Sequence, residues 1–207
     1  PKRFVLTYFF RVCTSRAMAM RNPSLAARAL AKLVDSWSIY SHGEHLSGNL
    51  SLAGFDIINH GNFASVVQGL PNQVIKVFSL NDVGYQILLD EFIKNESDHY
   101  PKIFSFTTSG NYGIVELEQL THSTKTAVAI SGYSDRVKSG STVKSHRWGD
   151  GFKNSILGLD RIIKDNNKSK KAVSLHWDGH EDNIMFRGTI PVLCDVIYGE
   201  KNRPAFN

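Results

Sequence analysis

The sequence predicts an α+β fold, in which an antiparallel sheet with one helix precedes a second half of helices and short hairpin strands. Residues 55–78 hold three short strand-like runs separated by glycine-containing turns. Residues 82–95 then place apolar side chains at helical spacing. The 207 residues are 42% hydrophobic and 21% charged, as in ordinary globular proteins. The chain is long enough for one sizeable core, or for two small lobes that share a cleft.

Residues 1–54 are predicted to form an N-terminal extension with one packing helix. Asn22, Pro23 and Ser24 offer a cap and a first-turn proline for a helix over residues 23–40. Its apolar residues on or near one face are Leu25, Leu30, Leu33 and Val34. Residues 41–54 are rich in Gly, Ser and His and predict a loop or linker. The basic and then apolar start, residues 1–10, is assigned no function.

Residues 55–120 predict the sheet, in the order β-β-β-α-β-β. Tight turns between successive strands favour an antiparallel meander, and Gly61, Gly69 and Gly110 lie in three such turns. The expected strands are residues 55–58, 64–68, 73–78, 101–106 and 112–117, and the expected helix is 82–95.

Residues 121–207 predict a smaller second half. Residues 121–146 are dense in Ser, Thr, Lys and Gly, so they are either a surface insertion or a weak helix. A helix is expected over residues 152–163, ended by residues 166–168. The expected strands are 172–175, 183–186 and 190–194. Since twelve residues follow Asp195 in this sequence, we expect this half to be reduced.

Charge and cysteine content narrow the classes of partner. The net charge is +5, and a basic protein suits an anionic partner such as a nucleotide, an acidic protein or RNA. No nucleic-acid recognition motif accompanies the charge, so nucleic acid is not favoured as a direct ligand. Cys13 and Cys194 lie far apart, which argues against a disulfide framework or structural zinc and favours a reducing cytoplasm. No apolar run approaches about 20 residues, so we expect no membrane span.

The strongest chemical signal lies in residues 176–195. Two short paired strands after Asp178 would bring Asn183 and Asp195 to one end of a hairpin. An amide oxygen and a carboxylate converging there are hard ligands suited to Mg²⁺. Asp178, slightly removed, can accept a proton from an attacking hydroxyl. This division of labour is the one that phosphoryl transfer requires.

A second group of residues lies on the predicted sheet. Gly61, Asn62 and Phe63 form a hairpin turn, with Val66 on the strand after it, and the backbone N–H groups of such a turn can lie over phosphates. Lys76, on the next strand, would place an ammonium under the same phosphates. Glu91, on the following helix, can hold that lysine in place, although Asp90 and Glu96 compete for this role. Taken singly, Lys76 could be a solvent-facing strand lysine and Gly61 an ordinary hairpin glycine.

Together these residues resemble the protein-kinase-like superfamily. Asp178 with Asn183 resembles the catalytic loop, Lys76 the strand lysine, and Asp195 the metal-binding aspartate that opens the activation segment. The runs 61–63, 70–77 and 183–186 are especially similar to the early serine/threonine protein kinases of short-tailed lytic bacteriophages. The resemblance covers residues 55–207, and it implies a two-lobed fold with a small lobe at 55–120 and a reduced C-terminal lobe at 121–207.

The resemblance also implies ligands and partners. ATP would lie beneath the turn at Gly61, with its adenine against Glu116, Leu117 and the two residues that follow. Mg²⁺ would be held by Asn183 and Asp195, with Asp178 as the base. His180 would donate to the transferring phosphate. The implied partners are host bacterial proteins, met in the host cytoplasm and plausibly those of transcription or RNA processing. Residues 121–146 are a candidate for autophosphorylation.

Departures from the kinase pattern leave two other functions open. Asn59 and Ala64 stand where a glycine loop has its first and third glycines, and the predicted second half is small. These features suit a kinase-like protein that acts by binding and inhibiting a host factor. His180 replaces the usual lysine and is similar to small-molecule kinases of the aminoglycoside and choline type, which suggests a small-molecule phosphotransferase.

Overall fold

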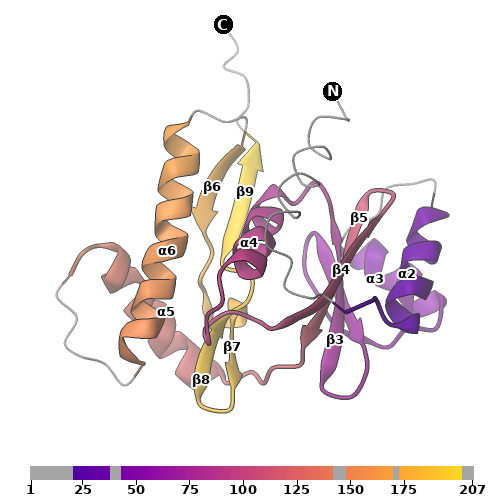
Figure 1. The fold of residues 1–207 in the computed structure, drawn as a ribbon, viewed down its shortest axis with the longest axis horizontal. Coiled ribbons are helices and arrows are strands. Elements are labelled where there is room, and N and C mark those ends of the chain that lie inside the picture. Colours follow the sequence, from indigo (N-terminus) through magenta and orange to yellow (C-terminus); the bar gives the residue numbers. More distant parts are fainter. Residues whose placement is uncertain (1–20, 38–42, 142–147, 170–172, 202–207) are drawn as a thin grey trace, which may run out of the picture.

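A five-stranded antiparallel sheet forms the centre of the N-terminal half (Figure 1). The computed structural model describes residues 21–37, 43–141, 148–169 and 173–201. The strand order is β1-β2-β3-β5-β4. The strands are β1 (Ile57–His60), β2 (Ala64–Gln68), β3 (Gln73–Ser79), β4 (Ile103–Ser109) and β5 (Tyr112–Glu118). The predicted α+β class with an antiparallel sheet is confirmed, and the predicted strand positions hold to within about three residues.

The two faces of the sheet are both buried, but against different partners. Side chains alternate along a strand, so neighbouring residues of β3 point to opposite faces. Ile75 and Val77 pack into a cluster with two N-terminal helices, whereas Phe78 packs into a larger cluster that continues into the C-terminal half. Lys76 shares the face of Phe78. The sheet therefore separates two cores, and Lys76 points to the side of the C-terminal half.

The first face is covered by α2 (Leu25–Asp35) and α3 (Gly43–Leu52). Ser24 caps α2, and its side chain accepts a hydrogen bond from Ala27 N–H at 3.1 Å. The prediction of a loop or linker at 41–54 was wrong for α3. Leu46 and Leu50, four residues apart, are fully buried against the sheet, and this tertiary contact outweighs the Gly and Ser content.

The second face is covered by α4 (Val83–Lys94), which lies at the centre of the molecule (Figure 1). Asp82 caps it by accepting the Tyr85 N–H at 3.0 Å. Tyr85, Leu88, Leu89 and Phe92 form its buried stripe. Gly84 lies against the backbone of Tyr198 and Gly199, so close that an added Cβ would stand 2.6 Å from it. The helix therefore joins the sheet to the last described strand.

The C-terminal half holds two helices and two small antiparallel sheets. The helices are α5 (Thr124–Lys138) and α6 (Gly149–Lys168). The sheets pair β6 (Val173–Trp177) with β9 (Ile197–Lys201), and β7 (Ile184–Arg187) with β8 (Ile190–Leu193). A single 3₁₀ turn, Glu181–Asn183, precedes β7. Figure 1 shows α6 alongside β6 and β9, with the β7–β8 hairpin below them.

The structure decides between the two alternatives left open for residues 121–146, and it corrects other predictions for this half. Residues 124–138 form a helix, because Ala127, Ile130, Tyr133, Ser134 and Val137 are buried at helical spacing. The proposed autophosphorylation stretch therefore includes an ordered helix, while its residues 142–146 lie outside the described part, as do the terminal segment 1–10 and Cys13. Helix α6 extends beyond 152–163 at both ends, and β9 was not predicted at all. Within the described ranges, no helix combines the length and apolarity that crossing a bilayer requires.

Candidate active site

Three oxygen-bearing residues meet at the open end of the β7–β8 hairpin. The backbone brings them together: Asp178 N–H donates to Val196 O at 2.8 Å, and Cys194 N–H donates to Asn183 O at 3.0 Å. Asp178, which follows β6, is therefore bonded to Val196, and Asn183 is bonded to Cys194. These two partners are the residues on either side of Asp195. The structure therefore places the sequence-predicted Asp178, Asn183 and Asp195 in one site.

The side chain of Asn183 holds the loop that carries Asp178. Its Nδ2 donates to the Asp178 backbone oxygen at 2.8 Å and to Asp178 Oδ2 at 3.1 Å. His180 Nε2 lies 3.0 Å from the same nitrogen and 3.7 Å from Asp178 Oδ1. Since the amide nitrogen faces Asp178, the amide oxygen is left for another partner. His180 is thus near the carboxylate that is predicted to act as base.

Gly179 explains how this loop closes. A Cβ at residue 179 would stand 2.4 Å from Nε1 of Trp177, so only glycine lets the loop fold over the indole. Trp177 packs against the large core, and the ammonium of Lys138 lies 4.5 Å from the centre of its ring. Its buried indole N–H has no hydrogen-bond partner among the described residues. Trp177 is therefore chiefly a packing residue that fixes the backbone before Asp178.

Lys76 crosses from the sheet to this hairpin end. It lies on β3 between Val66 of β2 and Val115 of β5, and it is buried, with 9% of its side chain exposed. Its Nζ donates to Asp195 Oδ2 at 2.7 Å. Nζ also lies 3.4 Å from the centre of the Tyr85 ring, within the range of a cation–π interaction. One buried ammonium therefore joins residues that are 119 positions apart.

The groups around Lys76 have shifted proton affinities because water is largely excluded. Burial raises the pKa of Cys194 to about 12 and that of Tyr85 well above its usual value, and the charge of Asp195 adds to both shifts. Burial also raises the pKa of Asp82 to about 6, because the lowering effects of the Tyr85 N–H and Lys76 are smaller. Both Cys194 and Tyr85 are therefore neutral at pH 7.

The predicted pairing of Glu91 with Lys76 was wrong. The acidic partner of Lys76 in the described structure is Asp195, whereas Glu91 interacts with Asn95 and with its neighbours Asp90 and Lys94. Glu91 follows Tyr85 by six residues, so it lies about 240° around the helix axis from Tyr85 and about 9 Å further along the helix. Tyr85, on the stripe that faces the sheet, occupies the place that was expected for a carboxylate.

The predicted nucleotide-binding residues divide between the two faces of the sheet. Val66 and Leu117 share the Lys76 face. The Glu116 side chain lies on the opposite face, where it accepts hydrogen bonds from Ser24 N–H at 3.1 Å and from the Ser105 hydroxyl. A nucleotide on the Lys76 face would therefore meet the backbone of residue 116 and not its side chain, and the predicted contact of the adenine with residues 116–119 stays a prediction.

The turn between β1 and β2 is open to solvent. Gly61, Asn62 and Phe63 are exposed, with Gly61 N–H donating to Ala64 O and Ser79 N–H donating to Phe63 O, each at 2.9 Å. A Cβ on Gly61 would meet nothing within 4 Å. Neither space nor backbone conformation thus requires glycine at residue 61 in this structure.

The predicted magnesium ligands have suitable chemistry. Mg²⁺ is usually held by one or two carboxylates together with water and phosphate oxygens, and the Asn183 amide oxygen and the Asp195 carboxylate fit such a set. No group of three His, Cys, Asp or Glu side chains suited to a metal ion exists in the described ranges. The residues therefore fit a cation that also takes ligands from a bound phosphate, and they do not form an all-protein metal cage.

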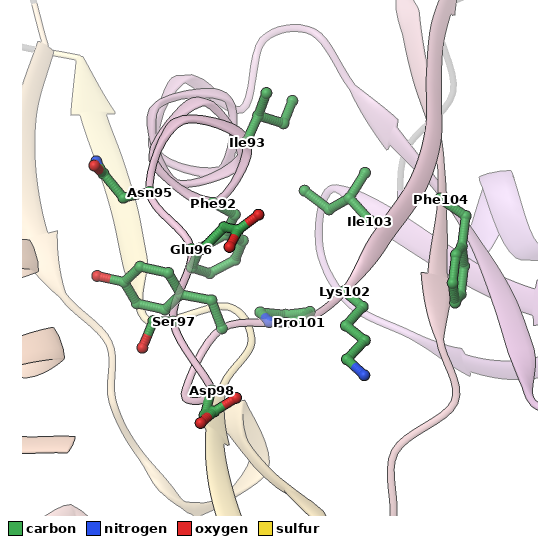
Figure 2. Close-up of a pocket in the computed structure, with 11 residues that line it drawn as sticks. Phe92, Ile93, Asn95, Glu96, Ser97, Asp98, Pro101, Lys102, Ile103 and Phe104 are labelled. Atoms are coloured by element: carbon green, nitrogen blue, oxygen red, sulfur yellow. The ribbon is translucent and has the colours of Figure 1, made fainter. Parts of the chain in front are cut away.

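An open pocket of about 570 Å³ lies away from this site (Figure 2). It is bounded by the end of α4, the loop that follows it and the start of β4. Figure 2 shows apolar side chains such as Ile93 and Ile103 beside the polar Glu96 and Lys102. None of the predicted site residues lines it. Its position does not support a role in the chemistry at Asp178.

Comparison with known proteins does not assign a family. No protein-family model matches the sequence, and no curated protein matches it significantly.

Two residues near Lys76 were not identified from the sequence: Asp82 and Tyr85, at the start of α4. In the sequence, Tyr85 is one of the apolar residues of the expected helix 82–95 and Asp82 is the first residue of that helix, so neither position indicates a site.

Proposed function

We propose that this protein binds ATP with Mg²⁺ and transfers the terminal phosphate to a serine or threonine hydroxyl of another protein. The observation that carries the proposal is the ion pair between Lys76 on the sheet and Asp195 on the hairpin, beside the Asp178–Asn183 contact. A buried ammonium, a carboxylate with an amide oxygen, and a second carboxylate are the groups that phosphoryl transfer uses.

The order of elements also supports a protein-kinase-like arrangement. A sheet turn, a strand lysine, a helix and a strand at the sheet edge are followed by a catalytic-type loop and a hairpin that ends in an aspartate. The α4 helix packs on both the sheet and the β6–β9 pair, which supports the direct contact between Lys76 on the sheet and Asp195 at the end of the hairpin. The departures are Glu91 and the open turn at Gly61.

Each residue has a task in the proposed reaction. Lys76 binds phosphate oxygens, and Asn183 and Asp195 hold Mg²⁺, which when bound offsets the negative charge of the phosphates. Asp178 accepts the proton of the attacking hydroxyl while the new O–P bond forms and the bond to ADP breaks. His180, beside Asp178, is positioned to donate to a phosphate oxygen. The protein substrates we propose are those of a bacterial host, on the resemblance of the sequence to phage kinases.

The direct test is phosphate transfer from labelled ATP by purified protein, with bacterial proteins as acceptors. Asp178→Asn keeps the shape of the side chain and an oxygen that can accept the Asn183 bond, but it removes the base. We expect transfer to fall at least about 100-fold, the usual contribution of a general base. The matched control is Asp165→Asn on α6, a carboxylate that is 65% exposed, and it should retain wild-type transfer.

The alternatives give different results in the same assay. A kinase-like inhibitor of a host factor would bind its partner without incorporating phosphate above the Asp178→Asn background. A small-molecule phosphotransferase would consume ATP without labelling any protein. Equal labelling by wild type and Asp178→Asn would contradict the proposed function, because the activity would then come from elsewhere.

Nucleotide binding can be measured separately by unfolding. A ligand that binds only the folded protein, at about 100 times its dissociation constant, raises the free energy of unfolding by roughly 2.7 kcal/mol. We expect MgATP to do so for the wild-type protein and ATP with a chelator to do so less. Lys76→Met, which replaces the ammonium with an apolar side chain, should abolish the increase.

A further inference from the structure

We propose that Tyr85 is a positioning residue, whose ring face holds the Lys76 ammonium at the phosphate site in place of a helix carboxylate. This inference rests on the proposed function, and it assigns to the first turn of α4 a role that the sequence placed at Glu91. The contact itself is direct: Nζ of Lys76 lies 3.4 Å from the centre of the ring.

The argument begins with the burial of the lysine. Only 9% of the Lys76 side chain is exposed, and an ammonium removed from water needs compensating interactions. In the described structure these are the Asp195 carboxylate at 2.7 Å, the Tyr85 ring and the charge of Asp82. A ring face attracts a cation through its quadrupole, and the attraction strengthens when water is excluded.

Nucleotide binding changes this balance. When Asp195 coordinates a cation, its charge is shared and no longer belongs to Lys76 alone. The Tyr85 ring remains, because it lies on a helix and makes no bond to the metal. A neutral partner has a further advantage over a carboxylate here: it holds the ammonium without cancelling the charge that should attract the phosphates.

The ring is fixed firmly enough for this task. Tyr85 is 1% exposed, its N–H is bound by the Asp82 cap, and its ring meets that of Phe78 edge-on with centroids 4.7 Å apart. One residue earlier, Gly84 packs against the backbone of Tyr198 and Gly199. The sheet, the helix and β9 therefore all determine where the ring lies.

The test compares three variants of Tyr85 with a matched aromatic control. Tyr85→Phe keeps the ring face, whereas Tyr85→Leu and Tyr85→Met remove it, the latter with a flexible side chain that fills much of the volume. Phe92→Leu is the control, because Phe92 is a buried aromatic on the same helix stripe that contacts Tyr100 and not Lys76. Circular dichroism checks that each variant is folded.

The first readout is steady-state kinetics. We expect Tyr85→Leu and Tyr85→Met to raise KM for ATP about tenfold, with KM for the protein substrate within about twofold of wild type. Tyr85→Phe and Phe92→Leu should keep both constants within about twofold. Equal losses in Tyr85→Leu, Tyr85→Met and Phe92→Leu would overturn the proposal, since the ring would then serve only packing.

The second readout needs no nucleotide. A short pulse of an amine-selective reagent, followed by peptide mass spectrometry, reports how freely the Lys76 amine reacts. Labelling of Lys76 should be several-fold faster in Tyr85→Leu and Tyr85→Met than in wild type, Tyr85→Phe or Phe92→Leu. Unchanged labelling would contradict the ring–ammonium contact. If wild type protects Lys76 but binds no MgATP, the proposed function fails while the contact stands, so the two failures are distinguishable.

Discussion

At the residue scale, two partly exposed carboxylates lie near one buried ammonium. Asp195 forms the ion pair with Lys76, and both of these charges shift the pKa of the nearby Asp82. Burial raises the pKa of Asp82 to about 6, the Tyr85 N–H lowers it, Asp195 raises it further and Lys76 lowers it. Asp82 is therefore a weaker acid in the folded protein than in the unfolded chain.

This shift predicts a stability that falls as pH rises. Asp82 binds its proton more tightly in the folded than in the unfolded protein, so its contribution is greatest below pH 4 and is lost as pH rises to about 6. Asp82→Asn removes the titration but keeps a good helix cap. We expect wild type to lose about 2–3 kcal/mol relative to Asp82→Asn between pH 4 and pH 7.

Urea unfolding of both proteins at several pH values measures this difference, because the other titrating groups are common to both. A difference that is constant with pH, or that moves in favour of wild type as pH rises, would show that the Asp82 carboxylate is not strained by burial. If the free energy of unfolding fell equally in both proteins as pH rises, acidic groups other than Asp82 would be responsible.

The sequence identified a site residue correctly where the short spacing along the chain alone determines its position. Asp178 and Asn183 lie in one short loop, and Asp195 ends a hairpin that starts beside them, so chain geometry alone brings them together. The predicted pairing of Glu91 with Lys76 was wrong because the rotation of a helix about its axis decides which of its acidic residues faces the sheet, and the sequence does not give that rotation. Tyr85 was missed because a buried aromatic is the ordinary content of a helix stripe.

At the scale of elements, close packing of α4 on β9 depends on the absence of two side chains. Gly84 and Gly199 face each other, and a Cβ on Gly84 would stand 2.6 Å from Gly199 N. Gly84→Ala should therefore force α4 away from β9 and lower the free energy of unfolding by about 1–3 kcal/mol, as overpacking does. Chemical denaturation measures the loss.

Gly132→Ala is the matched control for that substitution. Gly132 lies inside α5, and its added Cβ would meet only Arg136 Nη1, at 3.8 Å. There the better helix propensity of alanine should stabilise the protein by up to about 1 kcal/mol. Should Gly84→Ala behave like Gly132→Ala, the close approach of α4 and β9 would not exist in solution.

The prediction of elements succeeded where local pattern and tertiary packing agree. Strands β2, β3 and β5 and helix α4 carry regular spacing and were expected within two residues. Helix α3 was missed because its buried face holds only two apolar residues, Leu46 and Leu50, beside the polar Ser47. Strand β9 was missed because its stability comes from pairing with β6, whose paired residues lie 20 to 28 positions earlier in the chain, and its own sequence carries no alternation.

At the scale of the whole molecule, Arg187 ties the C-terminal hairpin to the sheet. Its guanidinium donates to both oxygens of Glu118 on β5, and also to the backbone oxygens of Asp98 at 2.7 Å and Tyr100 at 3.0 Å. Burial raises the pKa of Glu118, but the hydrogen bonds from Arg187 and Lys102 N–H outweigh it and lower the pKa. His99 adds a second link, through Nδ1 to Pro191 O at 2.9 Å.

Removal of this link should weaken the whole fold. Arg187→Ala leaves the Glu118 carboxylate, which is 12% exposed, without its partner, so we expect a loss of about 2–4 kcal/mol. Arg187→Lys keeps the charge but cannot reach all four acceptors, and its loss should be intermediate. Lys168→Ala is the control: its side chain is 79% exposed and that of its partner Asp165 is 65% exposed, so the change should stay below about 1 kcal/mol.

Urea denaturation of the three variants measures their free energies of unfolding, and so shows whether the Arg187 interactions stabilise the fold more than an exposed ion pair does. Similar midpoints for Arg187→Ala and Lys168→Ala would show that Arg187 does not stabilise the contact between the hairpin and the sheet. A loss for Arg187→Lys as large as that for Arg187→Ala would show that the fork geometry, and not the charge, carries the interaction.

The bond from Ser24 N–H to Glu116 has a consequence for how the chain is made. Its two ends are 92 residues apart, so α2 emerges during synthesis long before the strand that anchors it exists. Until then Leu30 and Val34 have no sheet to cover, and α2 and α3 alone are too short to be stable in water. We expect the nascent chain to remain unfolded until β5 has been translated, and a fragment ending before it to be degraded or bound by chaperones.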